Sequence, residues 1–154
     1  MKKLITALRD SQLQFAKNQT YRRRAIHEEI GGQQQGGIST PKSQPKVLIF
    51  SGDQGETYGY NDGWREDGYF LYTGEGQVGD MQFKSGNLAI RDHEANGKTI
   101  NLFFDAPERS HVIYHGGMRC VDWEWFQAYD REGNSRNAIR FVLENQDKVG
   151  QESE

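Results

Sequence analysis

Four apolar segments with the composition of β-strands follow one another, separated by short turns, over the last third of the chain. Their ranges are 99–105, 110–115, 118–130 and 136–144. In the last segment Ile139, Phe141 and Leu143 occupy every second position, which is the pattern of a half-buried strand. The Glu-Gly-Asn triplet at 132–134 has the composition of a hairpin turn. Since strands joined by short turns pair with their neighbours antiparallel, the sequence predicts a mostly antiparallel sheet.

Helices are expected before this sheet and between its strands. The pattern predicts helices over 3–16 and 20–30, strands over 46–50 and 69–73, and a short helix over 86–96 that begins after a Ser85 cap. This order indicates an α+β fold, in which N-terminal helices precede a curved sheet or open barrel.

Two glycine-rich segments interrupt the elements, at 31–41 and 74–87. In the first, four glycines bracket three consecutive glutamines, so a flexible loop is expected there rather than a packed element. Loops on a rigid sheet are where binding residues usually lie. These two loops are therefore the first candidates for a functional surface.

The length of 154 residues favours one domain, which we expect to span 1–145, followed by a polar tail or the start of a linker at 146–154. A single cysteine excludes an intrachain disulfide and fits a reducing compartment. No apolar run approaches the roughly 20 residues that span a membrane, and the N-terminus lacks a signal peptide's long apolar stretch. We expect a cytoplasmic protein without a membrane partner.

Charge is unevenly distributed along the chain. Residues 1–50 carry a net charge of +6, residues 51–80 of −6 and residues 81–154 of −3. This distribution is compatible with a localised phosphate-binding face, and equally with a solvated surface of uneven charge.

The sequence offers little for metal or nucleophilic chemistry. His111 and His115 are four residues apart on an expected strand, which places them about 13 Å apart, too far to share one ion. The Asp92-His93 pair weakly resembles a metal-dependent nuclease core, but no further histidine follows at a suitable spacing. Cys120 lies in an apolar strand and is expected in the core. We therefore expect no catalytic residue, metal or cofactor.

Two tyrosines beside the glycine-rich turns form the strongest candidate site. Tyr60 lies in YGYNDGW and Tyr72 in YTGEG. Two aromatic faces can hold a planar base between them, and stacking contributes about 1–3 kcal/mol per base. Asp62 could accept a hydrogen bond from an exocyclic amine of cytosine. The alternative is that both tyrosines are ordinary half-buried strand residues.

Several polar side chains are candidates for contacts with DNA. They are Arg22, Arg23 and Arg24 on the expected second helix, Gln33, Gln34 and Gln35 in the first loop, and Gln77 and Lys84 in the second. The arginines could bind phosphates or form a solvated helix face. The glutamines could fill the gap that a flipped base leaves or belong to a surface connection. Trp123 and Trp125 are expected to pack in the core or at its rim.

Read in order, the segments IHEEIGGQQQGGIST, KVLIFSG, GYNDGW, DGYFLYTGEGQVGDM and GNLAIRDH resemble one family. The chain resembles the SRA-like domain at the front of McrA-type HNH restriction endonucleases of the ScoMcrA-like kind, over roughly residues 20–145. It is more distantly similar to the eukaryotic SRA domain, in which a Gly-Tyr-acidic turn precedes a Tyr-Thr-Gly strand end.

The resemblance implies a PUA-like curved β-barrel with flanking helices, which flips a modified cytosine out of duplex DNA. It implies that Tyr60 and Tyr72 sandwich the base, that Asp62 reads its Watson–Crick edge, and that Thr73 and Gly74 form the pocket floor. One extra residue after the first tyrosine leaves Glu66 or Asp67 as substitutes for Asp62. The basic finger of eukaryotic SRA domains is replaced here by the segment 77–80, so the grip on DNA must differ.

The resulting hypothesis is a binding module for double-stranded DNA that contains 5-methylcytosine or another modified cytosine. It would direct an HNH nuclease domain, in cis or in trans, with a homodimer as a further option. Two alternatives stay open: a complete small nuclease, and a PUA-like module for modified RNA or a nucleotide.

Overall fold

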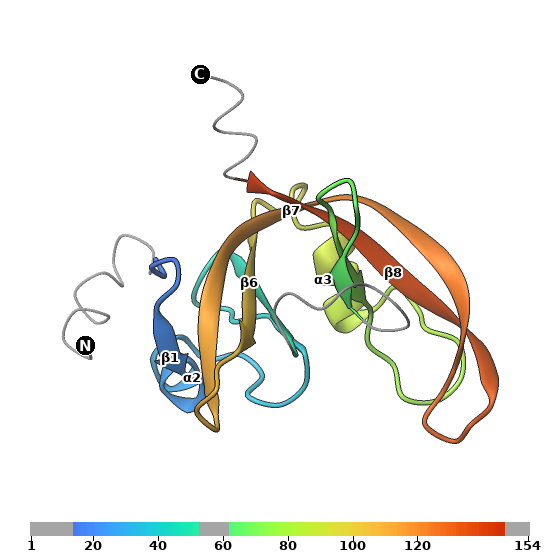
Figure 1. Ribbon diagram of the computed structural model, residues 1–154, viewed down its shortest axis with the longest axis horizontal. Coiled ribbons are helices and arrows are strands. Elements are labelled where there is room, and N and C mark those ends of the chain that lie inside the picture. Colours follow the sequence, from blue (N-terminus) through green and yellow to red (C-terminus); the bar gives the residue numbers. More distant parts are fainter. Residues whose placement is uncertain (1–13, 53–61, 147–154) are drawn as a thin grey trace.

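The structure is a computed structural model that describes residues 14–52 and 62–146. In these residues eight strands form one sheet in the order β2-β3-β6-β7-β8-β5-β4, and β1 is added to β7 (Figure 1). The strands are β1 (Thr20–Arg22), β2 (Ile38–Ser39), β3 (Lys46–Ser51), β4 (Gly63–Trp64), β5 (Phe70–Thr73), β6 (Thr99–Asp105), β7 (His111–Tyr129) and β8 (Ser135–Asn145), and the helices are α2 (Arg23–Ile30) and α3 (Ser85–Arg91). All pairs are antiparallel except β3 with β6. The predicted antiparallel sheet is thus largely confirmed.

Strand β7 is 19 residues long and links the two halves of the molecule. Its first half pairs with β1 and β6, and its second half pairs with β8. The register shifts opposite Leu102/Phe103 and again between Cys120 and Asp122, and such bulges bend a strand. The strand therefore forms the arch seen in Figure 1. The predicted break after His115 was wrong, because Gly116 adopts a φ of +147° that lets the strand continue through the bulge.

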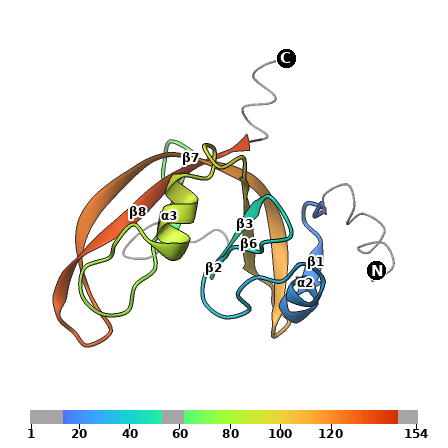
Figure 2. The ribbon, with the colours of Figure 1, turned by 180° about the vertical axis from the view of Figure 1, so that it is seen from behind.

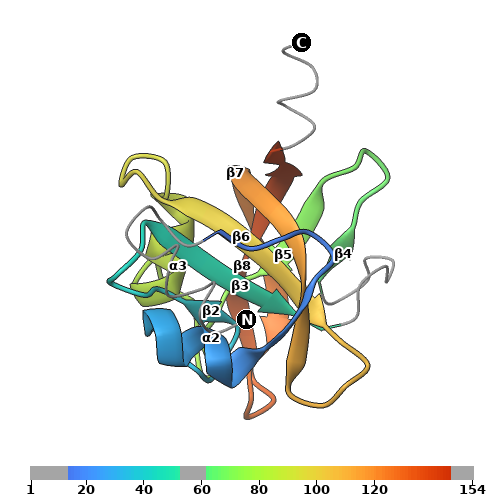
Figure 3. The ribbon, with the colours of Figure 1, turned by 90° about the vertical axis from the view of Figure 1, so that its left-hand side faces the viewer.

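Strand β3 is buried along its whole length, because both faces of the sheet are covered there. On one face Val47 and Ile49 join the main core, which includes residues of β5, β6, β8 and α3. On the other face Leu48 and Phe50 pack against α2 in a second, smaller core. Helix α2 lies beside β2 and β3 (Figure 3), whereas α3 lies under the arch of β7 and β8 (Figure 2).

The sheet is open in the described residues, so the PUA-like curved β-barrel implied by the resemblance is not confirmed. Among the described residues β2 and β4 stand at the two ends of the strand order and do not pair with each other. Each is only two residues long. Such short edges present too few free N–H and C=O groups to close a barrel.

The N-terminal helices also differ from the prediction. Most of the segment 3–16 lies outside the described residues, and 14–16 is not helical. The expected helix over 20–30 begins at Arg23 instead, because Thr20–Arg22 pair with β7 as a strand. Neither described helix exceeds eight residues, so neither has the length and apolarity to cross a membrane.

Helix α3 is shorter than predicted and is not capped by Ser85. It covers seven residues, its cap position is Lys84, and no side chain caps it. It ends at Arg91, and the chain turns until Gly97, where φ is +67°. The turn is held because the His93 ring lies close to the Lys98 carbonyl, with Nδ1 2.8 Å from the oxygen.

Candidate nucleic-acid interface

Asp62 brings three separate parts of the chain together at the ends of β3 and β5. The Ser51 hydroxyl donates to Oδ2 of Asp62 at 2.8 Å. The backbone N–H of Thr73 donates to Oδ1 at 2.7 Å. The carboxylate of Asp62 therefore lies directly beside the Tyr-Thr-Gly strand end, and its role as an edge reader stays a prediction.

The environment of Asp62 disfavours the charged form of its carboxyl group. Burial raises the pKa of its carboxyl above the ordinary value, against hydrogen bonds from Thr73 and Ser51 that lower it. Each carboxylate oxygen has two acceptor sites, so the bonds to Ser51 and Thr73 leave capacity for a ligand. A desolvated carboxylate with spare acceptor capacity is typical of a binding or catalytic position.

Tyr72 belongs to the main core, with only 4% of its surface exposed. Its hydroxyl donates to the carbonyl of Gly37 at 2.8 Å, and burial raises the pKa of the phenol far above its ordinary value. The pocket tyrosine is thus tied to the first glycine-rich loop. Tyr60, its predicted partner, lies outside the described residues, so the sandwich stays a prediction.

The predicted pocket floor is closely backed by α3. A Cβ added to Gly74 would lie 2.7 Å from Oδ1 of Asn87, so a larger residue there would displace the Asn87 amide. The amide of Asn87 accepts from the N–H of Glu75 and donates to the carbonyls of Glu75 and Gln82. It thereby fixes the start of the second loop.

The alternative acidic residues lie elsewhere. Asp67 is exposed and forms a bidentate pair with Arg65, in which Nε lies 2.9 Å from Oδ1. Glu66 is exposed as well. The structure therefore places Asp62, rather than Glu66 or Asp67, next to Tyr72 and Thr73.

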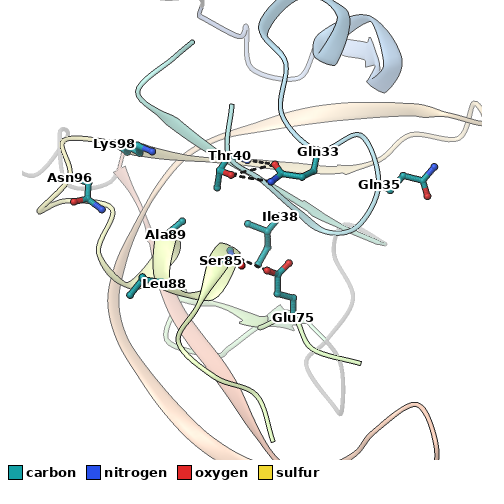
Figure 4. A pocket seen from close by; sticks show the side chains of 11 residues that line it. Gln33, Gln35, Ile38, Thr40, Glu75, Ser85, Leu88, Ala89, Asn96 and Lys98 are labelled. Carbon is teal, nitrogen blue, oxygen red and sulfur yellow. Dashed lines mark hydrogen bonds between the residues drawn. The ribbon is translucent and has the colours of Figure 1, made fainter. Parts of the chain in front are cut away.

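The first glycine-rich loop, residues 31–37, is called the glutamine loop below. The Gln33 side chain folds back, and its Oε1 accepts the backbone N–H of Thr40 at 2.8 Å, whereas Gln35 points away from this pair (Figure 4). Gln34 and Gln35 are exposed. The prediction of an unpacked loop over 31–41 was wrong at its end, where Ile38 and Ser39 form β2.

The second loop, residues 74–84, is tied to the turn between β7 and β8. The Arg131 guanidinium donates to Oε1 of Gln77 at 2.8 Å. The N–H of Gly79 donates to Asp130 at 2.9 Å, and Asp80 accepts the N–H of Asn137 at 2.7 Å. The candidate Gln77 is therefore engaged within the protein.

An apolar side chain projects from this anchored loop. Val78 is 51% exposed, next to Gly79, whose φ is +75°. Lys84, at the end of the loop, is exposed as well. Exposed residues on a rigid loop can enter a partner without first being ordered.

The two loops face each other across concave surfaces. One cavity of about 440 Å³ is lined by Gly36 and Gly37 on one side and by residues 75–78 and Lys84 on the other. A second cavity, of about 520 Å³, lies between the glutamine loop and α3, and Lys98 is among its lining residues (Figure 4). Both predicted DNA-contacting loops therefore border the same side of the fold.

The three arginines do not act as one basic face. Arg22 is exposed on β1, and Arg24 is exposed on α2, where its Nε lies 3.4 Å from the Glu28 carboxylate. Arg23 is turned inward instead, and its guanidinium carbon lies 3.8 Å from the centre of the Phe50 ring. Burial lowers the pKa of Arg23. The alternative that all three lie on a solvated helix face therefore does not hold for Arg23, which is turned inward, or for Arg22, which lies on a strand.

Comparison with known proteins identifies the family of this chain. The model of the ScoMcrA-like SRA domain matches residues 17–153. The chain belongs to the ScoMcrA-like SRA domain family. The resemblance noted from the sequence is thus confirmed. None of the curated proteins compared with this SRA domain matches it.

Several solved structures are similar to the SRA domain. One contains the sulfur-binding domain and SRA domain of ScoMcrA with phosphorothioated DNA, at 24% identity and a TM-score of 0.69, over 86% of this chain and 40% of that one. The SUVH5 SRA domain with methylated CHH DNA matches at 20% identity and a TM-score of 0.55, over 81% and 83% of the two chains. The modification-dependent restriction endonuclease AspBHI matches at 16% identity and a TM-score of 0.56, over 77% and 65%. The SRA domain spans less than half the length of the ScoMcrA chains that it matches.

The residues that weakly resembled a nuclease have other partners in the SRA domain. Nε2 of His93 accepts the backbone N–H of Cys120 at 3.1 Å, so both ring nitrogens of this buried histidine are occupied. Asp92 is paired with Arg91 at 2.8 Å. Burial raises the pKa of the Cys120 thiol to about 12, which disfavours a nucleophilic thiolate. Within 14–52 and 62–146 no three His, Cys, Asp or Glu side chains are grouped to hold a metal ion.

Sequence reasoning missed several residues that shape the interface. Ser51, Asn87 and Asp130 each bond to a loop or a pocket residue far away along the chain. In the sequence, only their positions could have indicated a role, because they lie directly after an expected strand, at the end of one, or inside a glycine-rich segment. Their partners are decided by the tertiary fold.

Proposed function

We propose that this SRA domain binds duplex DNA containing a modified cytosine and holds the flipped base beside Tyr72. The observation that carries the proposal is Asp62, a desolvated carboxylate held by Ser51 and Thr73 at the pocket expected from the sequence. Such a group is stabilised by a ligand that donates a hydrogen bond to it. The exocyclic amine of cytosine is such a donor.

The same carboxylate would discriminate between bases. Thymine presents a carbonyl where cytosine presents its amine, and leaving a buried acceptor unpaired costs about 1–3 kcal/mol. The modification itself is read more weakly, because burying one methyl group contributes about 0.8 kcal/mol, or roughly fourfold in affinity. In the proposal the methyl lies near Thr73 and Gly74.

The gap left by a flipped base must be filled from the two loops. The exposed ends that can do this are Gln34 and Gln35 on one loop and Val78 on the other, since Gln33 and Gln77 are bonded within the protein. Arg22, Arg24 and Lys84 are exposed and would contact phosphates. Tyr60 would supply the second stacking face.

The similar structures support DNA as the partner, since ScoMcrA and SUVH5 are in complex with phosphorothioated and methylated DNA respectively. We further propose that residues 1–145 form the reader and that 146–154 begin a linker. In this proposal an HNH nuclease, in cis or in trans, acts on the bound DNA in the cytoplasm, with a homodimer of the reader as a further option.

The test is binding to matched duplexes that carry cytosine, 5-methylcytosine or 5-hydroxymethylcytosine, measured by gel shift at fixed salt. The expected result is tighter binding to a modified duplex, by about tenfold or less for methylcytosine if methyl burial supplies most of the difference. Equal affinity for all three duplexes contradicts the proposal. Tighter binding to matched RNA favours the RNA module, and cleavage of methylated plasmid with a divalent metal favours the nuclease.

A further inference from the structure

Arg23 is held by contacts to three parts of the protein. Its guanidinium stacks on the ring of Phe50, with 3.8 Å between the guanidinium carbon and the ring centre. Its Nε–H donates to Nε2 of His27 at 3.2 Å. Its terminal N–H donates to the backbone carbonyl of Gln33 at 3.2 Å. A planar guanidinium with a fixed fork of donors can satisfy these contacts together, which the ammonium of lysine cannot.

The contact with Gln33 fixes the start of the glutamine loop. The end of the same loop is fixed by the Gly37 carbonyl, which accepts the hydroxyl of Tyr72 at 2.8 Å. The exposed residues 34–36 lie between these two points. Without Arg23 the loop would keep its attachment to Tyr72 and the bond from the Gln33 side chain to Thr40, but it would lose the contact that holds its backbone at Gln33.

We infer that Arg23 is a positioning residue, which orients the glutamine loop over the base pocket instead of contacting phosphate. The inference rests on the proposed function, because the loop matters for affinity only if the domain flips a base. Arg24 provides the contrast, since it follows directly on the same helix and its guanidinium is solvated and paired with Glu28.

The same contacts make the arrangement sensitive to the charge of His27. Arg23 can only donate and the Gly31 carbonyl can only accept, so His27 is neutral, with its proton on Nδ1, 2.9 Å from that carbonyl. Burial and the nearby Arg23 charge lower the pKa of His27. Asp105 on β6 and Tyr72 on β5 are the other ionisable groups that act on Arg23.

Protonation of His27 would remove the acceptor for the Arg23 Nε–H and place two cations side by side. Because the pKa is lowered, the neutral form persists through neutral pH, and the contact is lost only as pH falls below the ordinary range of histidine. Loop orientation should then weaken in mild acid.

The main experiment compares Arg23→Lys with Arg24→Lys, using a methylated duplex with 2-aminopurine beside the modified base. Arg23→Lys should lower affinity by about tenfold or more and reduce the 2-aminopurine signal, and the slope of log affinity against log salt should stay as in the wild type. Arg24→Lys should change the flipping signal little. If Arg23→Gln, which removes the charge, reduces the salt slope by about 1, Arg23 contacts a phosphate and the inference is overturned. Equal affinities for the wild type and Arg23→Lys overturn it as well.

Hydrogen exchange without DNA separates this inference from the proposed function. The amides of residues 31–37 should exchange faster in Arg23→Lys than in Arg24→Lys. If the wild type shows no preference for modified DNA, the proposed function fails, but the exchange rates still decide whether Arg23 orders the loop. Unchanged exchange in Arg23→Lys contradicts that role.

The pH dependence of affinity distinguishes a loop-positioning role of Arg23 from a general loss of stability. It also tests this role if Arg23→Lys does not fold. His27→Gln keeps an acceptor for Arg23 that cannot be protonated. Because the pKa of His27 is lowered, wild-type affinity should stay level down to about pH 6.5 and fall only below it, whereas His27→Gln should stay level throughout. Superimposable profiles would show that this contact does not control the loop.

Discussion

The replacement of Asp62 by Asn tests the base pocket most directly, because it removes the charge and keeps the shape. Oδ1 of the new amide can still accept the Thr73 N–H, now 2.7 Å away, and its NH₂ can donate to the Ser51 hydroxyl, now 2.8 Å away. What is lost is the charged acceptor for a cytosine amine. Hydrogen bonds to charged groups contribute about 1.5–3 kcal/mol, so affinity for the modified duplex should fall by about tenfold to a hundredfold.

Stability should respond in the opposite direction. The pKa of Asp62 is raised in the folded protein, so its contribution to stability is fully present below the ordinary value of 3.8 and is lost as pH rises through the folded pKa. At neutral pH the buried charge therefore opposes folding. Asp62→Asn should leave the melting temperature at pH 7 unchanged or higher, and the difference from the wild type should shrink as pH falls toward 4.

The assays are gel shift with methylcytosine and thymine duplexes and thermal denaturation over pH. Asp67→Asn is the matched control, since that carboxylate is exposed and paired with Arg65, and it should leave affinity unchanged. The reasoning is refuted if Asp62→Asn binds the methylated duplex as tightly as the wild type. A melting temperature lowered by many degrees would instead make Asp62 a structural residue.

Four further substitutions and one chemical treatment have defined expectations. Tyr60→Ala should weaken binding to the modified duplex by about tenfold or more, measured by gel shift, whereas Tyr72→Ala should mainly unfold the core, because truncating a buried aromatic costs about 3–5 kcal/mol. Tyr72→Phe keeps the ring and loses the bond to Gly37, so thermal denaturation should show a loss of about 1 kcal/mol with stacking retained. A Tyr72→Phe variant that no longer binds would show that binding depends on the hydroxyl and its bond to the glutamine loop, and not on the ring alone. Val78→Ala should reduce both affinity and the 2-aminopurine signal without changing the melting temperature, because the side chain is exposed, and unchanged binding would leave gap filling to the glutamine loop. Cys120, whose thiol pKa is raised to about 12, should resist iodoacetamide at pH 8 when followed by mass spectrometry, and rapid labelling of the folded protein would contradict its burial.

The local sequence pattern was sufficient to predict many of the strands in the sheet. Alternation and short turns predicted the strand over 99–105 at its observed bounds and the β8 strand to within one residue at each end. The same pattern could not show that residues 111–129 form one strand, because a glycine pair normally ends a strand. Only the partners on both sides, β6 and β8, hold it together through its bulges.

The sequence by itself determined the residue types of the site, because Tyr, Asp and Gly stand in a fixed order around YTGEG, and it determined the family. The tertiary structure decided which of them meet. Asp62 was chosen over Asp67 by the arrival of Ser51 and Thr73 from other strands, and Arg23 was separated from Arg22 and Arg24 by the direction in which α2 packs on Phe50. The physical reason is that spacing along the chain fixes the face of an element on which a side chain lies. Its contact partners come from distant segments, and no local sequence pattern shows which of these segments it will meet.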